Sequence, residues 1–163
     1  MNKFWLLVTA LLSGCAGIYQ QPSTSQPHAI LVTEFAENEL IQGGVQLFYA
    51  YDNDNCQANY GAAITALKDT ERTRTTRIPS DKKIYIQAAT IGNIDEVHAC
   101  STGFCVPTAK CTNLISFTPQ QGEIYTIKHN YKNNTCLISL TNNKTNKSPE
   151  SMRAHPIKSG CKI

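Results

Sequence analysis

The sequence predicts an all-β protein, an antiparallel β-sandwich stapled by disulfides. Apolar residues alternate with polar ones more often than they recur at helical spacing. About seven or eight short segments rich in β-branched and aromatic residues follow one another at intervals of about ten residues, with turn residues between them. Cysteines are spread along the chain rather than paired in close C-x-x-C units. Together these observations favour two packed sheets over a helical fold.

The first strands are expected at 29–36 (AILVTEFA), 45–51 (VQLFYAY) and 62–68 (AAITALK). In 45–51 the apolar and aromatic residues at odd-numbered positions share one face of a strand. The alanines and leucine of 62–68 also suit a helix, but the short length favours a strand.

Residues 72–90 (RTRTTRIPSDKKIYIQAAT) are predicted to form a polar strand, a turn at 79–82 and an apolar strand. In the second strand Ile84, Ile86 and Ala88 point one way, whereas Tyr85 and Gln87 point the other. This alternation is typical of an antiparallel sheet with one solvated face.

Residues 91–110 show no sustained period and predict a long loop, which we expect to be stapled by Cys100 and Cys105. Strands at 112–118, 123–131 and 136–140 are then expected to form a meander. If they stack in order, Cys111 and Cys136 lie near the same end of the sheet, so their pairing is possible. The polar tail is expected to run extended along the surface, tied back by Cys161. We favour a sandwich of immunoglobulin-like or transthyretin-like kind over a small barrel.

The N-terminus has the layout of a secretory signal peptide. Lys3 precedes an apolar run from Phe4 to Leu12, and the small residues Ser13 and Gly14 follow it. The run is shorter than the roughly 20 residues that a transmembrane helix needs. Residues 1–14 are therefore expected to be a signal peptide that is removed.

The sequence LSGC, residues 12–15, resembles the lipobox of bacterial lipoproteins. The resemblance implies that Cys15 receives a diacylglycerol, that the signal is cut before it, and that the new amino terminus is acylated, with chains such as palmitate. Two or more chains are enough for stable anchoring. Because Ala16 replaces the aspartate that marks inner-membrane retention in this family, the resemblance implies the outer membrane, with the domain in the periplasm or at the cell surface. The alternative is a plain signal peptide followed by a chance cysteine.

After Cys15, residues 16–28 are rich in Gln, Pro, Ser and Thr and contain no Asp, Glu, Lys or Arg. This composition predicts a flexible tether at 15–28. A single domain is expected to occupy residues 29–163.

The cysteines predict disulfides. With Cys15 lipidated, an even set remains in an oxidising compartment and can form up to three bridges of unknown connectivity. The competing interpretation is a metal site formed by His98, Cys100, Cys105 and Cys111, but the spacing lacks a zinc signature. We favour disulfides, with no metal. The candidate cysteines are Cys56, Cys100, Cys105, Cys111, Cys136 and Cys161.

The net charge of +3, lowered by one when Lys3 is removed, gives no indication of a nucleic-acid partner. The common hydrolase and nucleotide-binding motifs are absent from the sequence, so no enzyme activity, catalytic residue or cofactor is predicted. His129 is expected to be a structural histidine on the face of Tyr125 and Ile127. Asp52 and Asp54 lie in YDNDNC, which lacks the later residues of a calcium loop and predicts a solvated turn.

Arg72, Arg74 and Arg77 form a possible basic contact stripe, in which alternation puts Arg72 and Arg74 on one face. Such a stripe could bind an acidic partner or a lipid phosphate. Basic residues also protect an edge strand from aggregation, and we favour this second explanation.

Residues 111–140 also resemble the end of small outer-membrane lipoproteins of uncertain role, some of them secretion-system accessories. The resemblance implies a sandwich. The expected function is a lipid-anchored structural or accessory module with a protein partner in an envelope assembly. The alternative is a binding module, such as a hydrolase inhibitor or small-ligand binder, that uses the loop from Cys100 to Cys111.

Overall fold

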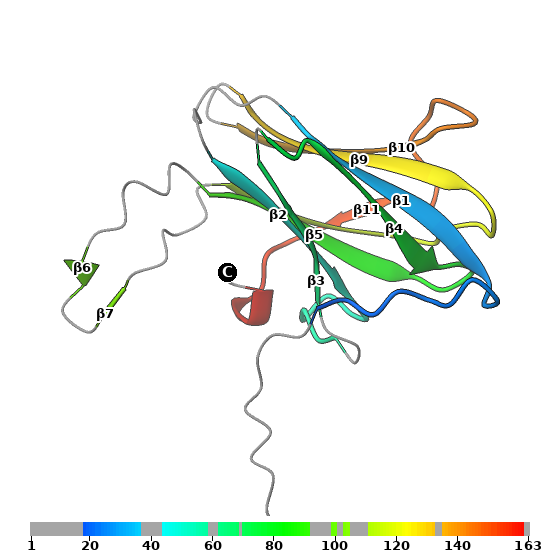
Figure 1. The fold of residues 1–163 in the computed structure, drawn as a ribbon, viewed down its shortest axis with the longest axis horizontal. Helices are drawn as coiled ribbons and strands as arrows, with labels where there is room; N and C mark the ends of the chain where they lie inside the picture. Colours follow the sequence, from blue (N-terminus) through cyan, green and yellow to red (C-terminus); the bar gives the residue numbers. More distant parts are fainter. Residues whose placement is uncertain are drawn as a thin grey trace, which may run out of the picture.

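The computed structural model describes residues 18–36, 44–58, 62–68, 70–91, 99–100, 103–104, 111–132 and 135–161. This part of the protein consists of strands and connecting turns with one short 3-10 helix, η2 (Ser159–Cys161) (Figure 1). The strands are β1 (His28–Phe35), β2 (Val45–Tyr51), β3 (Ala63–Leu67), β4 (Thr73–Pro79), β5 (Ile84–Ile91), β6 (Ala99–Cys100), β7 (Gly103–Phe104), β8 (Cys111–Phe117), β9 (Ile124–Lys132), β10 (Thr135–Asn142) and β11 (Arg153–His155).

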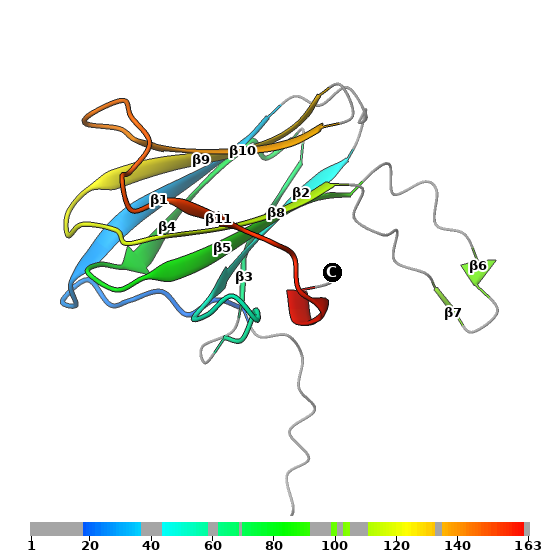
Figure 2. The same cartoon turned by 180° about the vertical axis from the view of Figure 1, so that it is seen from behind.

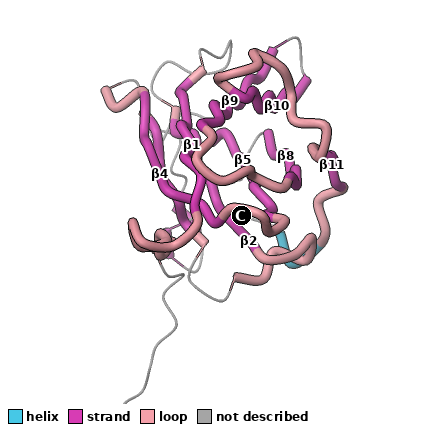
Figure 3. Tube along the Cα trace, turned by 90° about the vertical axis from the view of Figure 1, so that its right-hand side faces the viewer, coloured by secondary structure: helices cyan, strands magenta, loops and turns pink. Residues whose placement is uncertain are grey.

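Two sheets pack face to face, which confirms the predicted β-sandwich. One sheet has the strand order β10-β9-β1-β4 and the other β11-β8-β5-β2-β3, while β6 and β7 pair separately. Figure 3 views the two layers from the side. Among these described strands, every pairing is antiparallel except that of β1 with β9, which is parallel.

The core lies between the sheets and follows from period-two alternation. In β1 every second residue is buried, and in β5 the inward residues include Ile86, which is fully buried. Phe117 packs edge-on against Tyr125 with 5.2 Å between ring centroids, which joins the two layers. Gln46 is also fully buried, and its side-chain amide exchanges hydrogen bonds of 3.2 and 2.8 Å with the backbone of Ala36.

The predicted C-terminal meander is wrong. β8 pairs with β5 and β11 in one sheet, whereas β9 and β10 pair in the other. The turn at Gly122, which has a φ of 75° and donates its N–H to His28 O at 2.9 Å, carries the chain between the sheets. Turn residues mark where a strand ends but not which sheet the next strand joins, because that depends on long-range packing. The disulfide Cys111–Cys136 consequently joins β8 to β10 across the sandwich, with 5.5 Å between Cα atoms.

The outer face of β5 is not solvated as predicted. Gln87 is fully buried, and its side chain meets Cys161 O of the C-terminal segment. This segment runs from β11 to η2 over the outer side of the sheet (Figure 2). Tyr85 is half-buried, with its ring 5.2 Å from that of His155. The tail is extended along the surface, in agreement with the sequence, but it also buries polar residues beneath it.

Candidate binding site

An open cleft of about 560 Å³ lies where residues 19–27, the loop after β2 and the turn between β4 and β5 meet. We call it the N-terminal cleft. Aromatic, proline and aliphatic side chains make up much of its lining, and charged groups also face it. The lining includes Tyr19, Tyr51, Pro27, Pro79, Ile84, Asp52 and Lys82.

One wall of the N-terminal cleft is the segment that composition assigns to the flexible tether. Ile18 forms a parallel bridge with Ala63, and the N–H of Tyr19 donates to Ala63 O at 3.0 Å. Arg77 binds the same segment twice: its backbone N–H donates to Gln21 Oε1 at 2.9 Å and its Nε donates to Pro22 O at 2.8 Å. Contacts with the domain therefore begin before Ala29. Although the composition of this segment is mainly polar, the Tyr19 ring packs against the core, and Pro22 O accepts a hydrogen bond from Arg77.

The cleft is lined by an ion pair and by two tyrosines whose pKa values are raised. Lys82 Nζ lies 3.0 Å from Asp52 Oδ1. Burial, with a smaller contribution from Asp52, raises the pKa of Tyr19 to about 12. Burial also raises the pKa of Tyr51 to about 12, with a smaller contribution from Tyr49. Both phenols are therefore neutral at physiological pH.

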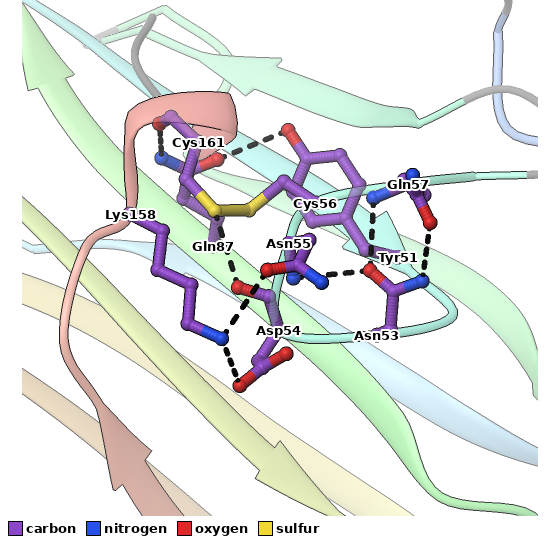
Figure 4. The surroundings of a disulfide bond; sticks show 9 residues. All are labelled: Tyr51, Asn53, Asp54, Asn55, Cys56, Gln57, Gln87, Lys158 and Cys161. Atoms are coloured by element: carbon purple, nitrogen blue, oxygen red, sulfur yellow. Dashed lines mark hydrogen bonds and ion pairs between the residues drawn. A yellow bond between two sulfur atoms is a disulfide. The ribbon is translucent and has the colours of Figure 1, made fainter.

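Beside the cleft, the loop after β2 is fastened to the C-terminal segment (Figure 4). We call residues 52–58 and 158–161 the C-terminal clasp. The disulfide Cys56–Cys161 closes it, with an S–S distance of 1.99 Å and 5.1 Å between Cα atoms. Lys158 Nζ adds an ion pair of 2.6 Å to Asp54, which lowers the pKa of that carboxyl group.

The clasp also holds a buried amide against the sheet. Gln87 Nε2 donates to Cys161 O at 2.5 Å, and Tyr51 OH donates to Gln87 Oε1 at 3.0 Å. Cys56 has a left-handed φ of 59°, which is uncommon for a residue other than glycine. Gly160 approaches so closely that a Cβ there would lie 2.8 Å from Asn55 O. The aspartates of YDNDNC thus belong to a structured loop tied to the tail.

His129 lies in the core, as expected for a structural histidine. Its ring nitrogens lie 2.8 Å from Thr90 Oγ1 and 3.0 Å from Asn113 Oδ1, and Nε2 is 3.6 Å from Cys111 Sγ. Burial lowers the pKa of His129 to about 4. The ring is therefore neutral at pH 7.

Ser116 and His155 form a pair of the kind found in nucleophilic catalysis, since Ser116 Oγ lies 2.8 Å from His155 Nε2. However, Ser116 is only 1% exposed, and neither residue lines the N-terminal cleft. The hydrogen bond joins β11 to β8, which is a structural role.

The three arginines of the predicted stripe have different neighbours. The Arg72 guanidinium lies 5.4 Å from the centre of the Phe35 ring, and Arg74 pairs with Glu71 at 3.0 Å. Arg77 instead binds the segment at 21–22. β4 is an edge strand, as the protective explanation of these charges requires.

Several predicted site residues cannot be compared with the structure. Cys15, His98 and Cys105 lie outside the described residues, and Cys100 lies in β6. The Cys100–Cys105 staple and the alternative metal cluster therefore stay predictions. In the part of the chain that is described, no group of three or more metal-ligating side chains occurs. Within the same residues, no helix is long and apolar enough to cross a membrane.

The sequence did not predict the N-terminal cleft. Tyr19 was the available signal, because an aromatic ring in a mainly polar segment can bury a large apolar surface. Comparison with known proteins finds no family model that matches the chain and no curated protein similar to it. The fold and the site define the class, a disulfide-bonded β-sandwich with an N-terminal cleft.

Proposed function

We propose that this protein is a lipoprotein of the bacterial cell envelope, anchored in the outer membrane by acyl chains on Cys15. Its sandwich acts as a structural or accessory module that binds a protein partner in an envelope assembly. The basic residue, apolar run, small residues and cysteine at 3–15 support the anchor.

The observation that carries the accessory role is the attachment of residues 18–27 to the sandwich. Contacts to Ala63 begin at Ile18, three residues after Cys15, and those to Arg77 begin at Gln21, so an anchor at Cys15 would hold a stiff domain in place. Disulfides at Cys56–Cys161 and Cys111–Cys136 add to this stiffness. A rigid body at fixed height above a membrane suits the bracing of a larger assembly.

The anchor is tested by cell fractionation of a Cys15→Ser variant. The variant is expected to leave the membrane fraction, while the control Ala16→Ser, which keeps the thiol, stays there. A Cys15→Ser protein that remains in the membrane without acylation contradicts the proposal.

The partner is tested by cross-linking in intact cells with the tagged full-length protein, followed by mass spectrometry. One reproducible envelope protein is expected, and it should be lost with Cys15→Ser. Capture of no protein from a well-expressed, acylated sample contradicts the accessory role.

A second candidate is a small-ligand binding module, which the N-terminal cleft favours, because its 560 Å³ is within the usual range of ligand sites. Most of the loop from Cys100 to Cys111, which the sequence predicts as the alternative binding region, lies outside the described residues. A ligand of the cleft should raise Tm in a thermal-shift screen. An Ala58→Trp variant, which fills the cleft, should abolish that shift.

A further inference from the structure

We infer that the surface around the N-terminal cleft, made by residues 18–27, 52–58 and 79–83, lies against phospholipid headgroups. The opposite end of the sandwich then points away from the membrane. This orientation rests on the proposed acylation of Cys15, and it adds to that proposal a docking surface and its partner, the lipid headgroup layer.

The short connection from Cys15 keeps the N-terminal cleft close to the membrane. Ile18 is fixed to the edge strand β3 through its bridge with Ala63. Only three residues lead from Cys15 to Ile18, a span of about 10 Å when fully extended. An acylated Cys15 therefore keeps Ile18, and the cleft that begins at Tyr19, within about 10 Å of the membrane surface.

Several contacts prevent the domain from rotating freely about Ile18. The hydrogen bond from Tyr19 to Ala63 and the two from Arg77 hold the segment at both ends of 19–22. The Tyr19 ring also packs against the hydrophobic core. Because the tether is bound along its length, the position of the acylated Cys15 determines how the sandwich is oriented relative to the membrane.

The side chains around the N-terminal cleft suit contact with lipid headgroups. Ile18 is 82% exposed, an apolar side chain at the point nearest the anchor, where lipid would cover it. Lys83 is exposed where it lines the cleft, and a lysine near an anionic leaflet is attracted to lipid phosphates. Asp52 and Asp54 pair with Lys82 and Lys158, and the exposed Asp81 balances Lys83, so these groups together carry no net charge that an anionic leaflet would repel.

The lengths of β4 and β5 show how far the opposite end of the sandwich lies from the N-terminal cleft. β5 starts at Ile84, which lines the cleft, and ends at Ile91, while β4 runs from Thr73 to Pro79, which also lines the cleft. At about 3.3 Å per residue, Ile91 is about 23 Å from Ile84. Residues at this far end should therefore lie well clear of the lipid.

The test uses the full protein extracted from membranes and placed in nanodiscs that contain a gadolinium-chelating lipid. Amide relaxation by the gadolinium is measured by NMR. The amides of Lys82 and Lys83 should relax at least roughly tenfold faster than those of Thr90 and Ile91, given their separation along the strand. Equal relaxation at the two ends would overturn the inference.

Two variants show whether the bound tether sets the orientation. Arg77→Ala removes the bond from Nε to Pro22 O but keeps the backbone bond to Gln21, and it should reduce the difference between the ends. Arg74→Ala, on the same strand with its side chain paired to Glu71, should not. If Arg77→Ala does not fold, a flexible insertion of eight Gly and Ser residues between Gly17 and Ile18 replaces it and should level the relaxation. A difference that is unchanged in the folded Arg77→Ala variant, or in the insertion variant that replaces it, would overturn the role of the tether.

The mass of the same sample separates this inference from the proposed function. An acylated Cys15 with equal relaxation at the two ends refutes only the orientation. An unacylated Cys15 refutes the proposed anchor, and the orientation is withdrawn with it.

Discussion

Removing the clasp disulfide with the double substitution Cys56→Ala and Cys161→Ala should destabilise the protein strongly. The two cysteines are 105 residues apart, so their bridge restricts most of the unfolded chain. Chain-entropy arithmetic gives about 4.8 kcal/mol for a loop of this length, against about 3.5 kcal/mol for the 25-residue separation of Cys111 and Cys136. For a domain of this size the larger value corresponds to a fall in Tm of about 15 °C.

The assay is urea unfolding at pH 7, with the midpoint and the slope m measured separately. The midpoint should fall and m should rise, because the freed chain exposes more surface when it unfolds. Lys158→Ala is the matched control, since it removes the ion pair of the same clasp but keeps the disulfide, and its effect should be much smaller. A loss below about 1 kcal/mol in the double variant would refute the reasoning, because the loop closure would then contribute almost nothing.

Three further predictions test the core, the tether and the clasp. Because burial lowers the pKa of His129 to about 4, the unfolded chain takes up a proton at higher pH than the folded one, and stability should fall by about 3 kcal/mol between pH 7 and pH 4. His129→Gln should remove most of this loss in urea titrations, while His28→Gln should not. Arg77→Ala should speed hydrogen exchange at the Tyr19 amide, and an unchanged rate would contradict the role given to Arg77. Gly160→Ala should lower stability by about 1–3 kcal/mol in thermal unfolding, since its Cβ would lie 2.8 Å from Asn55 O, and an unaltered Tm would refute this.

The local alternation of residues was enough to predict most strands. β1 at 28–35, β2 at 45–51 and β5 at 84–91 match the expected segments because side-chain direction in a strand depends only on sequence position. The turn at 79–82 was predictable for the same local reason, since proline restricts the backbone and serine and aspartate favour turns.

Features that depend on distant segments were not predictable from the sequence alone. The parallel pairing of β1 with β9 and the division of β8 and β9 between two sheets require knowledge of which surfaces meet. Gln87 has a polar side chain that fits a solvated face, and only the returning tail explains its burial. The N-terminal cleft depends likewise on Arg77 meeting a segment 55 residues earlier in the chain.

The central claim is that Cys15 carries the anchor of this domain, and the most direct test is the mass of the N-terminal peptide of the protein extracted from bacterial membranes. The account predicts a peptide that starts at Cys15 and carries a diacylglycerol with a further acyl chain on its amino group. A peptide with a free Cys15 thiol, or one that starts elsewhere, would contradict it.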